Sequence, residues 1–150
     1  MTEKYAKTDN PLVFFDTNIL LYSIDENDKN KRAIATKILQ DAANNKTGII
    51  STQTLQEFFN VAIKKFKLSK EIAKEYVQFF ANHFLVTPIS VPVLLDAIDI
   101  SIKHQLSIWD SLMLSSANDT GCIILYSEDM NNGQIIKGTK ILNPFGENVA

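Results

Sequence analysis

The chain has few of the residues on which several common kinds of site depend. Its single cysteine, Cys122, excludes an internal disulfide and a zinc site built from several cysteines. Its five glycines are scattered, so they form neither a phosphate-binding loop nor a dinucleotide-binding fingerprint. Arg32 is the one arginine among fifteen basic residues, which leaves little scope for bidentate clamps on phosphate groups.

Charge and hydropathy narrow the class of protein further. The formal net charge of −2 argues against a general polyanion-binding surface and leaves room only for a local basic patch. With 45% hydrophobic and 21% charged residues, the 150-residue chain is expected to form one globular domain after a polar tail over residues 1–10. That tail lacks the apolar core of a signal peptide, and the lone cysteine suits the reducing cytoplasm, where we expect the protein to act. The longest apolar region, residues 84–102, contains prolines and aspartates, so we expect no membrane span.

Apolar runs that predict strands alternate with apolar residues at helical spacing. The expected strands cover residues 12–16, 48–51, 85–89, 122–126 and 139–142. The expected helices cover residues 17–24, 30–45, 54–66, 92–105 and 107–118. Another helix is capped by Ser69, with Ile72, Ala73, Tyr76, Phe79 and Phe80 facing inward. This alternation predicts the α/β class, with a mainly parallel sheet and helices on both of its faces.

Two carboxylates follow the first two expected strands. Asp16 ends the first strand and precedes a helix, so it is either a helix N-cap or a group placed for chemistry at the carboxyl end of a parallel sheet. Glu57 lies one to two turns into the helix after the second strand. Thr54 and Glu57 have capping-box spacing, but the apolar neighbours of Glu57 favour a buried carboxylate that needs a partner or a metal.

Two more carboxylates occur in the second half of the chain. Asp110 lies three residues after Ser107 at the start of an expected helix, where a carboxylate favours the positive helix end. Its neighbours, including Trp109, are apolar, so we do not expect a free surface charge. Asp129 follows the strand at residues 122–126, in a segment whose composition also favours a plain turn. Glu128 and Asn132 are alternatives for this fourth position.

These four acids are predicted to meet in one crevice, because each lies at the carboxyl end of a strand or in the first turns of the helix beyond it. Clustered carboxylates repel one another, and their pKa values rise unless a cation lies between them. One or two Mg²⁺ or Mn²⁺ ions would fit such a site, since hard ions prefer oxygen ligands. Four polar side chains would hold the carboxylates or bound water in place: Thr17, Asn18, Ser111 and Ser127.

Two basic stretches are candidates for contacts with phosphate groups. Lys64, Lys65 and Lys67 form a charge run near the end of an expected helix. The run is either a solvated helix end, where cations offset the macrodipole, or a source of sequence-independent affinity for a polyanion. The second stretch contains Lys29, Lys31 and Arg32 and has the same two interpretations.

The motifs around the four acids resemble those of PIN-domain nucleases, and most of all the VapC-type toxins of toxin–antitoxin pairs. The matching stretches are FFDTNILLY at Phe14–Tyr22, STQTLQEFFNV at Ser51–Val61, SIWDSLMLSSA at Ser107–Ala117 and ILYSEDMNNGQ at Ile124–Gln134. The closing Asn143-Pro144-Phe145 also fits. The resemblance spans nearly the whole chain in the expected order.

This resemblance implies a three-layer α/β/α sandwich and a Mg²⁺- or Mn²⁺-dependent endoribonuclease. Catalytic and metal-binding roles carry over to Asp16, Glu57 and Asp110, with Asp129 chosen for the fourth position. Lys64, Lys65, Lys67 and Arg32 then become candidates for binding RNA. The resemblance also implies a cognate antitoxin protein as partner and a homodimer.

Two other functions share this pattern of residues. A PIN fold used only for binding can keep all four acids without a productive geometry. A phospho-acceptor signalling domain also uses a strand-end aspartate with Mg²⁺, but its acceptor normally follows the third strand, and residues 85–90 contain no acid. Cleavage of RNA would separate the enzyme from both alternatives.

Overall fold

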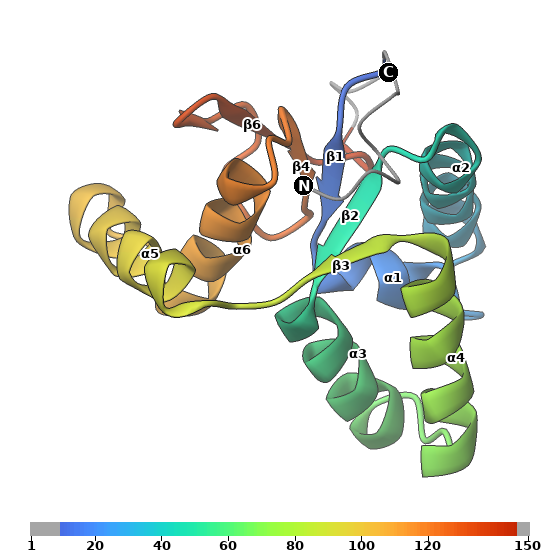
Figure 1. Ribbon diagram of the computed structural model, residues 1–150. Helices are drawn as coiled ribbons and strands as arrows, with labels where there is room; N and C mark the ends of the chain where they lie inside the picture. The colour runs from blue at the N-terminus through green and yellow to red at the C-terminus, as the bar shows by residue number, and fades with distance from the viewer. Residues whose placement is uncertain (1–9, 147–150) are drawn as a thin grey trace.

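A six-stranded sheet forms the centre of the molecule, in the order β3-β2-β1-β4-β6-β5 (Figure 1). The computed structural model describes residues 10–146, so all but the last residue of the expected tail lies outside the described residues. The strands are β1 (Val13–Phe15), β2 (Gly48–Ser51), β3 (Leu85–Thr87), β4 (Ile124–Tyr126), β5 (Ile135–Ile136) and β6 (Thr139–Leu142). All neighbouring strands pair in parallel except β5, which is antiparallel to β6.

Helices cover both faces of this sheet, which confirms the expected α/β/α sandwich (Figure 1). The helices are α1 (Thr17–Tyr22), α2 (Lys29–Asn45), α3 (Thr52–Lys64), α4 (Lys70–His83), α5 (Val91–His104) and α6 (Ile108–Asp119). Helices α1 to α4 pack on the face that contains Phe15 and Ile50. Helices α5 and α6 pack on the opposite face, against Phe14 and Ile49. Consecutive strand residues point to opposite faces, so the apolar run at 13–15 and 48–50 supplies both cores.

Each helix begins at a polar residue whose side chain accepts a hydrogen bond from a backbone N–H in the first turn. Such a cap fixes where a helix starts, and the starts of α1, α3 and α6 decide where the acids lie. The six caps are Asp16, Asp28, Ser51, Ser69, Ser90 and Ser107.

The structure corrects several expectations about individual elements. Helix α3 starts at Thr52, and its capping box joins Ser51 to Thr54 rather than Thr54 to Glu57. Ile72 and Phe79 on α4 were expected to face inward but are 46% and 52% exposed. Strand β5 was not expected, and it forms a hairpin with β6 through Lys137 and Gly138, both with positive φ. The helical period gives the direction of a side chain, but only the neighbouring elements decide whether that direction is covered.

Candidate active site

The carboxyl ends of β1, β2 and β4 lie side by side, because these three parallel strands are neighbours in the sheet. Asp16 follows β1 directly, and Asp129 lies three residues beyond β4. Glu57 is in the second turn of α3, which starts immediately after β2. Asp110 comes from the first turn of α6, which packs on the opposite face of the sheet. Because α6 follows α5, the expectation that every acid lies at or just beyond a strand was wrong for Asp110. The topology therefore brings the four expected acids to the side of the sheet where these strands end, which we call the acidic edge. Ligands of other open parallel sheets bind at the same position.

Asp16 is the most buried of the four, with 8% of its surface exposed. Its Oδ1 accepts a hydrogen bond from the backbone N–H of Thr17 at 2.7 Å, so it is the N-cap of α1 as well. Its Oδ2 accepts from Ser127 Oγ at 2.7 Å and from Asn18 Nδ2 at 3.4 Å. Burial raises the pKa of Asp16 to about 6, against the lowering effect of the Ser127 and Thr17 hydrogen bonds. The negative charges of Glu57 and Asp110 raise this pKa further.

Glu57 is half-buried, and each of its carboxylate oxygens has its own donor. Thr17 Oγ1 donates to Oε1 at 2.8 Å, and Gln53 Nε2 donates to Oε2 at 3.3 Å. The same Gln53 nitrogen donates to the backbone carbonyl of Trp109 at 3.1 Å, which ties α3 to the first turn of α6. Both of these partners are acceptors, so the orientation of the Gln53 amide is fixed. Sequence reasoning missed Gln53, whose only signal was its position one helical turn before Glu57.

Asp110 is half-buried at the start of α6, where its backbone N–H donates to the cap Ser107 Oγ at 3.1 Å. Burial raises the pKa of Asp110, and the charges of Asp129 and Glu57 raise it further, whereas the Ser107 hydroxyl lowers it. The expected apolar cover is incomplete, because Trp109 is 61% exposed. The hydroxyl of Ser111, expected to support this site, is buried and has no hydrogen-bond partner among residues 10–146.

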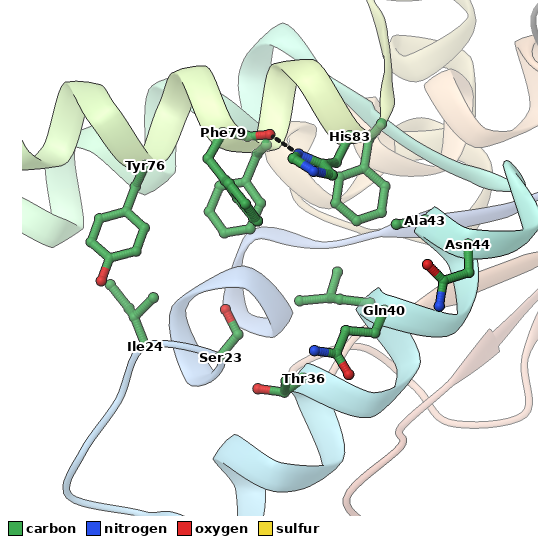
Figure 2. Close-up of a pocket in the computed structure, with 12 residues that line it drawn as sticks. Ser23, Ile24, Thr36, Gln40, Ala43, Asn44, Tyr76, Phe79 and His83 are labelled. Atoms are coloured by element: carbon green, nitrogen blue, oxygen red, sulfur yellow. Dashed lines mark hydrogen bonds between the residues drawn. The ribbon is translucent and has the colours of Figure 1, made fainter.

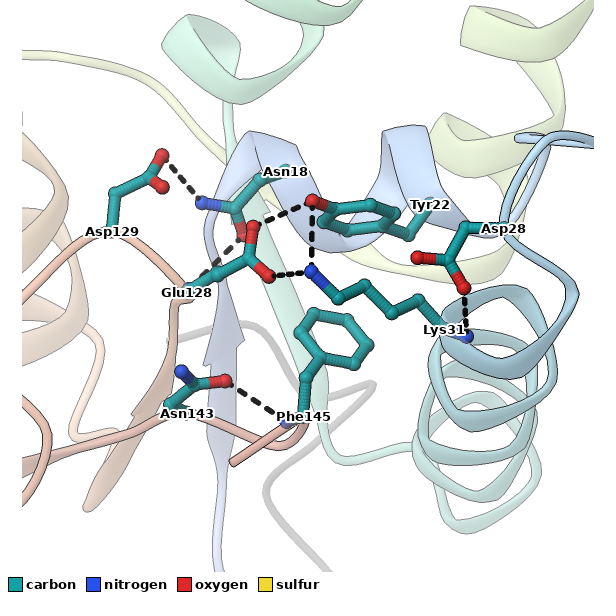
Figure 3. Close-up of polar contacts among 8 residues, drawn as sticks. All are labelled: Asn18, Tyr22, Asp28, Lys31, Glu128, Asp129, Asn143 and Phe145. Atoms are coloured by element: carbon teal, nitrogen blue, oxygen red, sulfur yellow. Dashed lines mark hydrogen bonds and ion pairs between the residues drawn. The ribbon is translucent and has the colours of Figure 1, made fainter. Parts of the chain in front are cut away.

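The segment after β4 separates the candidates for the fourth acid (Figure 3). The Glu128 carboxylate accepts from Tyr22 Oη at 2.6 Å and from Lys31 Nζ at 2.5 Å, so it is bound to α1 and α2. The Asp129 carboxylate is exposed and accepts from Asn18 Nδ2 at 3.1 Å. Asn132 is occupied elsewhere, since its Oδ1 accepts from the backbone N–H of Asn143 at 2.9 Å.

The four carboxylates interact electrostatically, yet they are not arranged around a common point. The charges of Glu57 and Asp110 act on Asp16, and those of Glu57 and Asp129 act on Asp110. Within the described range, no three histidine, cysteine, aspartate or glutamate side chains stand in a group that could hold a metal ion. The donor chemistry fits a hard divalent cation, because the donors are oxygens and mutual repulsion is already present. Side-chain movement would be needed before several of them shared one ion.

The basic residues are less organised than the acids. Lys64, Lys65 and Lys67 are exposed around the end of α3, and none of them forms an ion pair in the part of the chain that the structure describes. The second stretch is divided, because Lys31 is bound to Glu128 whereas Arg32 lies with Lys29 along an exposed depression on α2.

Comparison with known proteins identifies the family of the chain. Residues 13–133 match the PIN domain family, and this match covers most of the sequence. The chain therefore belongs to the PIN-domain family, which confirms the resemblance seen in its motifs. No curated protein matches the chain. Within residues 10–146, none of the helices is both long and apolar enough to cross a membrane.

Solved structures with the same fold include several toxin–antitoxin systems. A toxin–antitoxin complex from Klebsiella pneumoniae matches with a TM-score of 0.67 and 20% identity, covering 89% of this chain and 98% of that chain. VapBC2 from Rickettsia felis, bound to a DNA fragment from its promoter, matches with a TM-score of 0.65 and 18% identity, covering 87% and 96%. Mycobacterium tuberculosis VapC20, a toxin that cleaves the sarcin–ricin loop, matches with a TM-score of 0.63 and 13% identity, covering 75% and 86%. At these identities the likeness establishes the fold.

Proposed function

We propose that this PIN-domain protein is a divalent-metal-dependent endoribonuclease and the toxin of a toxin–antitoxin pair, acting in the cytoplasm. The observation that carries the proposal is the meeting of Asp16, Glu57, Asp110 and Asp129 at one edge of the sheet, where burial and mutual repulsion raise the pKa of Asp16 to about 6. A cluster of carboxylates held in this way is costly for a fold, and a bound cation would offset the cost. The similar solved structures of toxin–antitoxin complexes support the same function.

In this proposal Asp16, Glu57 and Asp110 hold Mg²⁺ or Mn²⁺, and Asp129 binds a second ion or orients water. When bound, such an ion neutralises phosphate charge and lowers the pKa of a coordinated water. The chain's own polar groups keep the carboxylates in place: Ser127 and Thr17 donate to Asp16, and Gln53 donates to Glu57. At Asp16 these hydrogen bonds also oppose the effect of burial, because a donated hydrogen bond lowers a carboxyl pKa.

Substrate affinity in this proposal comes partly from cations outside the acidic edge. Lys64, Lys65, Lys67 and Arg32 are exposed and are available to bind RNA phosphates. Each contact of this kind would be independent of base sequence and would weaken as salt increases. The choice of RNA would then depend on other groups near the acids.

We further propose two protein partners. An antitoxin would pack into the apolar groove between α2 and α4, which has a volume of about 380 Å³ and is lined by Leu39, Tyr76, Phe79 and Phe80 among others (Figure 2). Phe79 stands at this groove with about half of its surface exposed, its ring 4.2 Å from that of His83. A second copy of the chain would pack on the exposed apolar face of α5.

A binding module without catalytic activity is the second candidate. It is favoured by one observation: no three acidic side chains among residues 10–146 form a ready metal-binding group. Such a protein would keep the fold and the antitoxin surface and would not cut RNA. The two candidates differ in one measurable property, the cleavage of RNA in the presence of a divalent cation.

The decisive experiment is cleavage of a mixed RNA pool by the purified protein, with Mg²⁺ or Mn²⁺ and separately with EDTA. We expect cleavage only with metal, and we expect Asp16→Asn to reduce it by at least about 10²-fold because a ligand and its charge are lost. Asp119→Asn, at the far end of the helix that carries Asp110, is the matched control and should cleave normally. Cleavage by Asp16→Asn at the normal rate would refute the metal assignment, and no cleavage by folded wild-type protein would favour the binding module.

A further inference from the structure

Trp109 is the only tryptophan of the chain, and it is unusually exposed. Its 61% exposure is high for a residue type that is largely buried on average. Within the described range, the indole makes no hydrogen bond and no contact with another aromatic ring or a cation. A large apolar ring is thus left in solvent without a structural role that the fold accounts for.

The backbone that carries this ring is rigidly held beside the acids. Trp109 is the residue before Asp110, in a helical turn capped by Ser107. Its carbonyl accepts the hydrogen bond from Gln53, the residue that also donates to Glu57. Gln53 is buried, with 6% of its surface exposed, so this tether is sheltered from water. The Gln53 hydrogen bond therefore fixes the backbone of Trp109 beside the helix that supplies Glu57.

We propose that Trp109 is a stacking site for an unpaired nucleobase of the RNA held at the four carboxylates, an inference that rests on the proposed nuclease function. Four carboxylates repel phosphates, and with a net charge of −2 and one arginine the chain has little general attraction for a polyanion. Contacts that do not depend on charge would therefore add to the affinity that the exposed lysines supply. Base stacking on an aromatic ring is such a contact, and it tolerates any base because every base has a π-face.

This placement also predicts the form of RNA that is bound. A base can stack on a protein side chain only when it is free of its own helical stack, so the site selects single strands, loops and ends over duplex. The stacked base would lie close to the acids, because Trp109 and Asp110 share the first turn of α6, with their side chains on different sides of the helix. Exposed apolar residues on α5 make a protein contact the rival explanation for the same ring.

The single tryptophan allows a direct test by intrinsic fluorescence. Asp16→Asn protein, used to prevent cleavage, is titrated with a short single-stranded RNA and with the same sequence as a duplex. We expect saturable quenching or a spectral shift with the single strand and little change with the duplex. No fluorescence change upon RNA binding would overturn the proposal. A change that follows protein concentration instead of RNA would also overturn it and would assign Trp109 to a protein interface.

Variants provide the quantitative test. In the Asp16→Asn background, Trp109→Ala should weaken the binding of fluorescently labelled RNA by between about fivefold and about a hundredfold, the effect of losing one stacked base. Trp109→Phe should retain part of the affinity. Ile135→Ala, which truncates a residue that is 64% exposed on β5, is the matched control and should bind normally. Equal affinity of Trp109→Ala and the control would overturn the proposal.

Kinetics separate this inference from the nuclease proposal. In the active background, Trp109→Ala should raise KM for single-stranded RNA while kcat changes less, because stacking holds substrate before the reaction. If the wild type cleaves RNA but Trp109→Ala has an unchanged KM, the stacking site fails and the nuclease stands. If RNA quenches Trp109 and no cleavage occurs with metal, the nuclease fails while the nucleobase site stands.

Discussion

Asp16 shows most clearly how a single residue combines structure with chemistry. The carboxylate caps α1 and at the same time faces the charges of Glu57 and Asp110. Two hydrogen bonds lower its pKa, but burial acts more strongly, and the result is a pKa of about 6. A neutral asparagine could form the cap, so the negative charge is retained for something other than folding. This is the pattern expected of functional carboxylates.

The raised pKa of Asp16 predicts how stability depends on pH. Between about pH 4 and pH 6 the folded protein holds a proton at Asp16 that the unfolded chain releases, so the free energy of unfolding falls as pH rises through this window. The full loss is roughly 3 kcal/mol, at about 1.4 kcal/mol per pKa unit. Asp16→Asn should remove most of this loss and be more stable than wild type near pH 8 without divalent metal. Urea unfolding of both proteins at several pH values measures this change in the free energy of unfolding.

The control for this prediction is Asp119→Asn, which should unfold with the pH dependence of the wild type. Asp110 contributes in the same direction as Asp16, because its pKa is raised too, so some pH dependence should persist in Asp16→Asn. Identical pH profiles for wild type and Asp16→Asn would show that Asp16 is not held at a raised pKa.

At the scale of elements, the turn after β4 is held between two helices. Glu128 receives hydrogen bonds from Tyr22 on α1 and Lys31 on α2, and Asn18 on α1 donates to Asp129 (Figure 3). Lys31 also lies 4.8 Å from the centre of the Tyr22 ring. From this arrangement we expect the two neighbouring acids to have different roles: Glu128 joins elements, and Asp129 belongs to the proposed acidic site.

Substitution of each acid by its amide should separate these tasks. Glu128→Gln should lower the free energy of unfolding by about 1 kcal/mol, a value that allows for partial solvent screening, and should keep most of the cleavage activity. Asp129→Asn should leave stability nearly unchanged and reduce cleavage at least about tenfold. Urea unfolding and RNA cleavage are measured for both variants. Loss of cleavage in Glu128→Gln with full activity in Asp129→Asn would reverse the assignment of the fourth acid.

At the scale of the whole molecule, α5 leaves an apolar stripe uncovered. Val91, Leu95, Ile98 and Ile102 are exposed, and their spacing of four, three and four residues places them on one face of the helix. The spacing reads the same in both directions, so two antiparallel copies of α5 could match Val91 with Ile102 and Leu95 with Ile98. Self-complementary surfaces of this kind suit a two-fold symmetric dimer.

We expect the protein to be a dimer in solution that Leu95→Glu combined with Ile102→Glu converts to a monomer. Each substitution would bury an unpaired charge in the proposed interface, which a small dimer does not tolerate. Light scattering coupled to gel filtration gives the mass. Ile72→Glu, at an exposed apolar residue of α4, is the control and should remain dimeric. A monomeric wild type, or a double variant that stays dimeric, would contradict the prediction.

Most of the layered architecture could be predicted, since it follows from local signals. Apolar runs, helical spacing and polar caps each act within a few residues, and they located nearly every strand and helix to within a few positions. The β5–β6 hairpin was missed although a signal was present: the Lys137-Gly138 turn between Ile136 and Thr139 is of the short type that hairpins use. Contacts between residues that are far apart in the sequence had no local signal of this kind. Lys31 and Glu128 are 97 residues apart, and Gln53 and Trp109 are 56 apart.

The sequence by itself determined the α/β class, the order of the elements and which four acids were candidates, because strand polarity and capping are local properties that topology then aligns. Only the tertiary structure decided which of those acids are buried and which hydrogen bonds hold them. It also decided that the neighbouring Glu128 forms an ion pair with Lys31. It also decided that Phe79, Trp109 and the stripe on α5 remain exposed. Burial and long-range pairing depend on what packs against a residue, and that is a property of the folded chain as a whole.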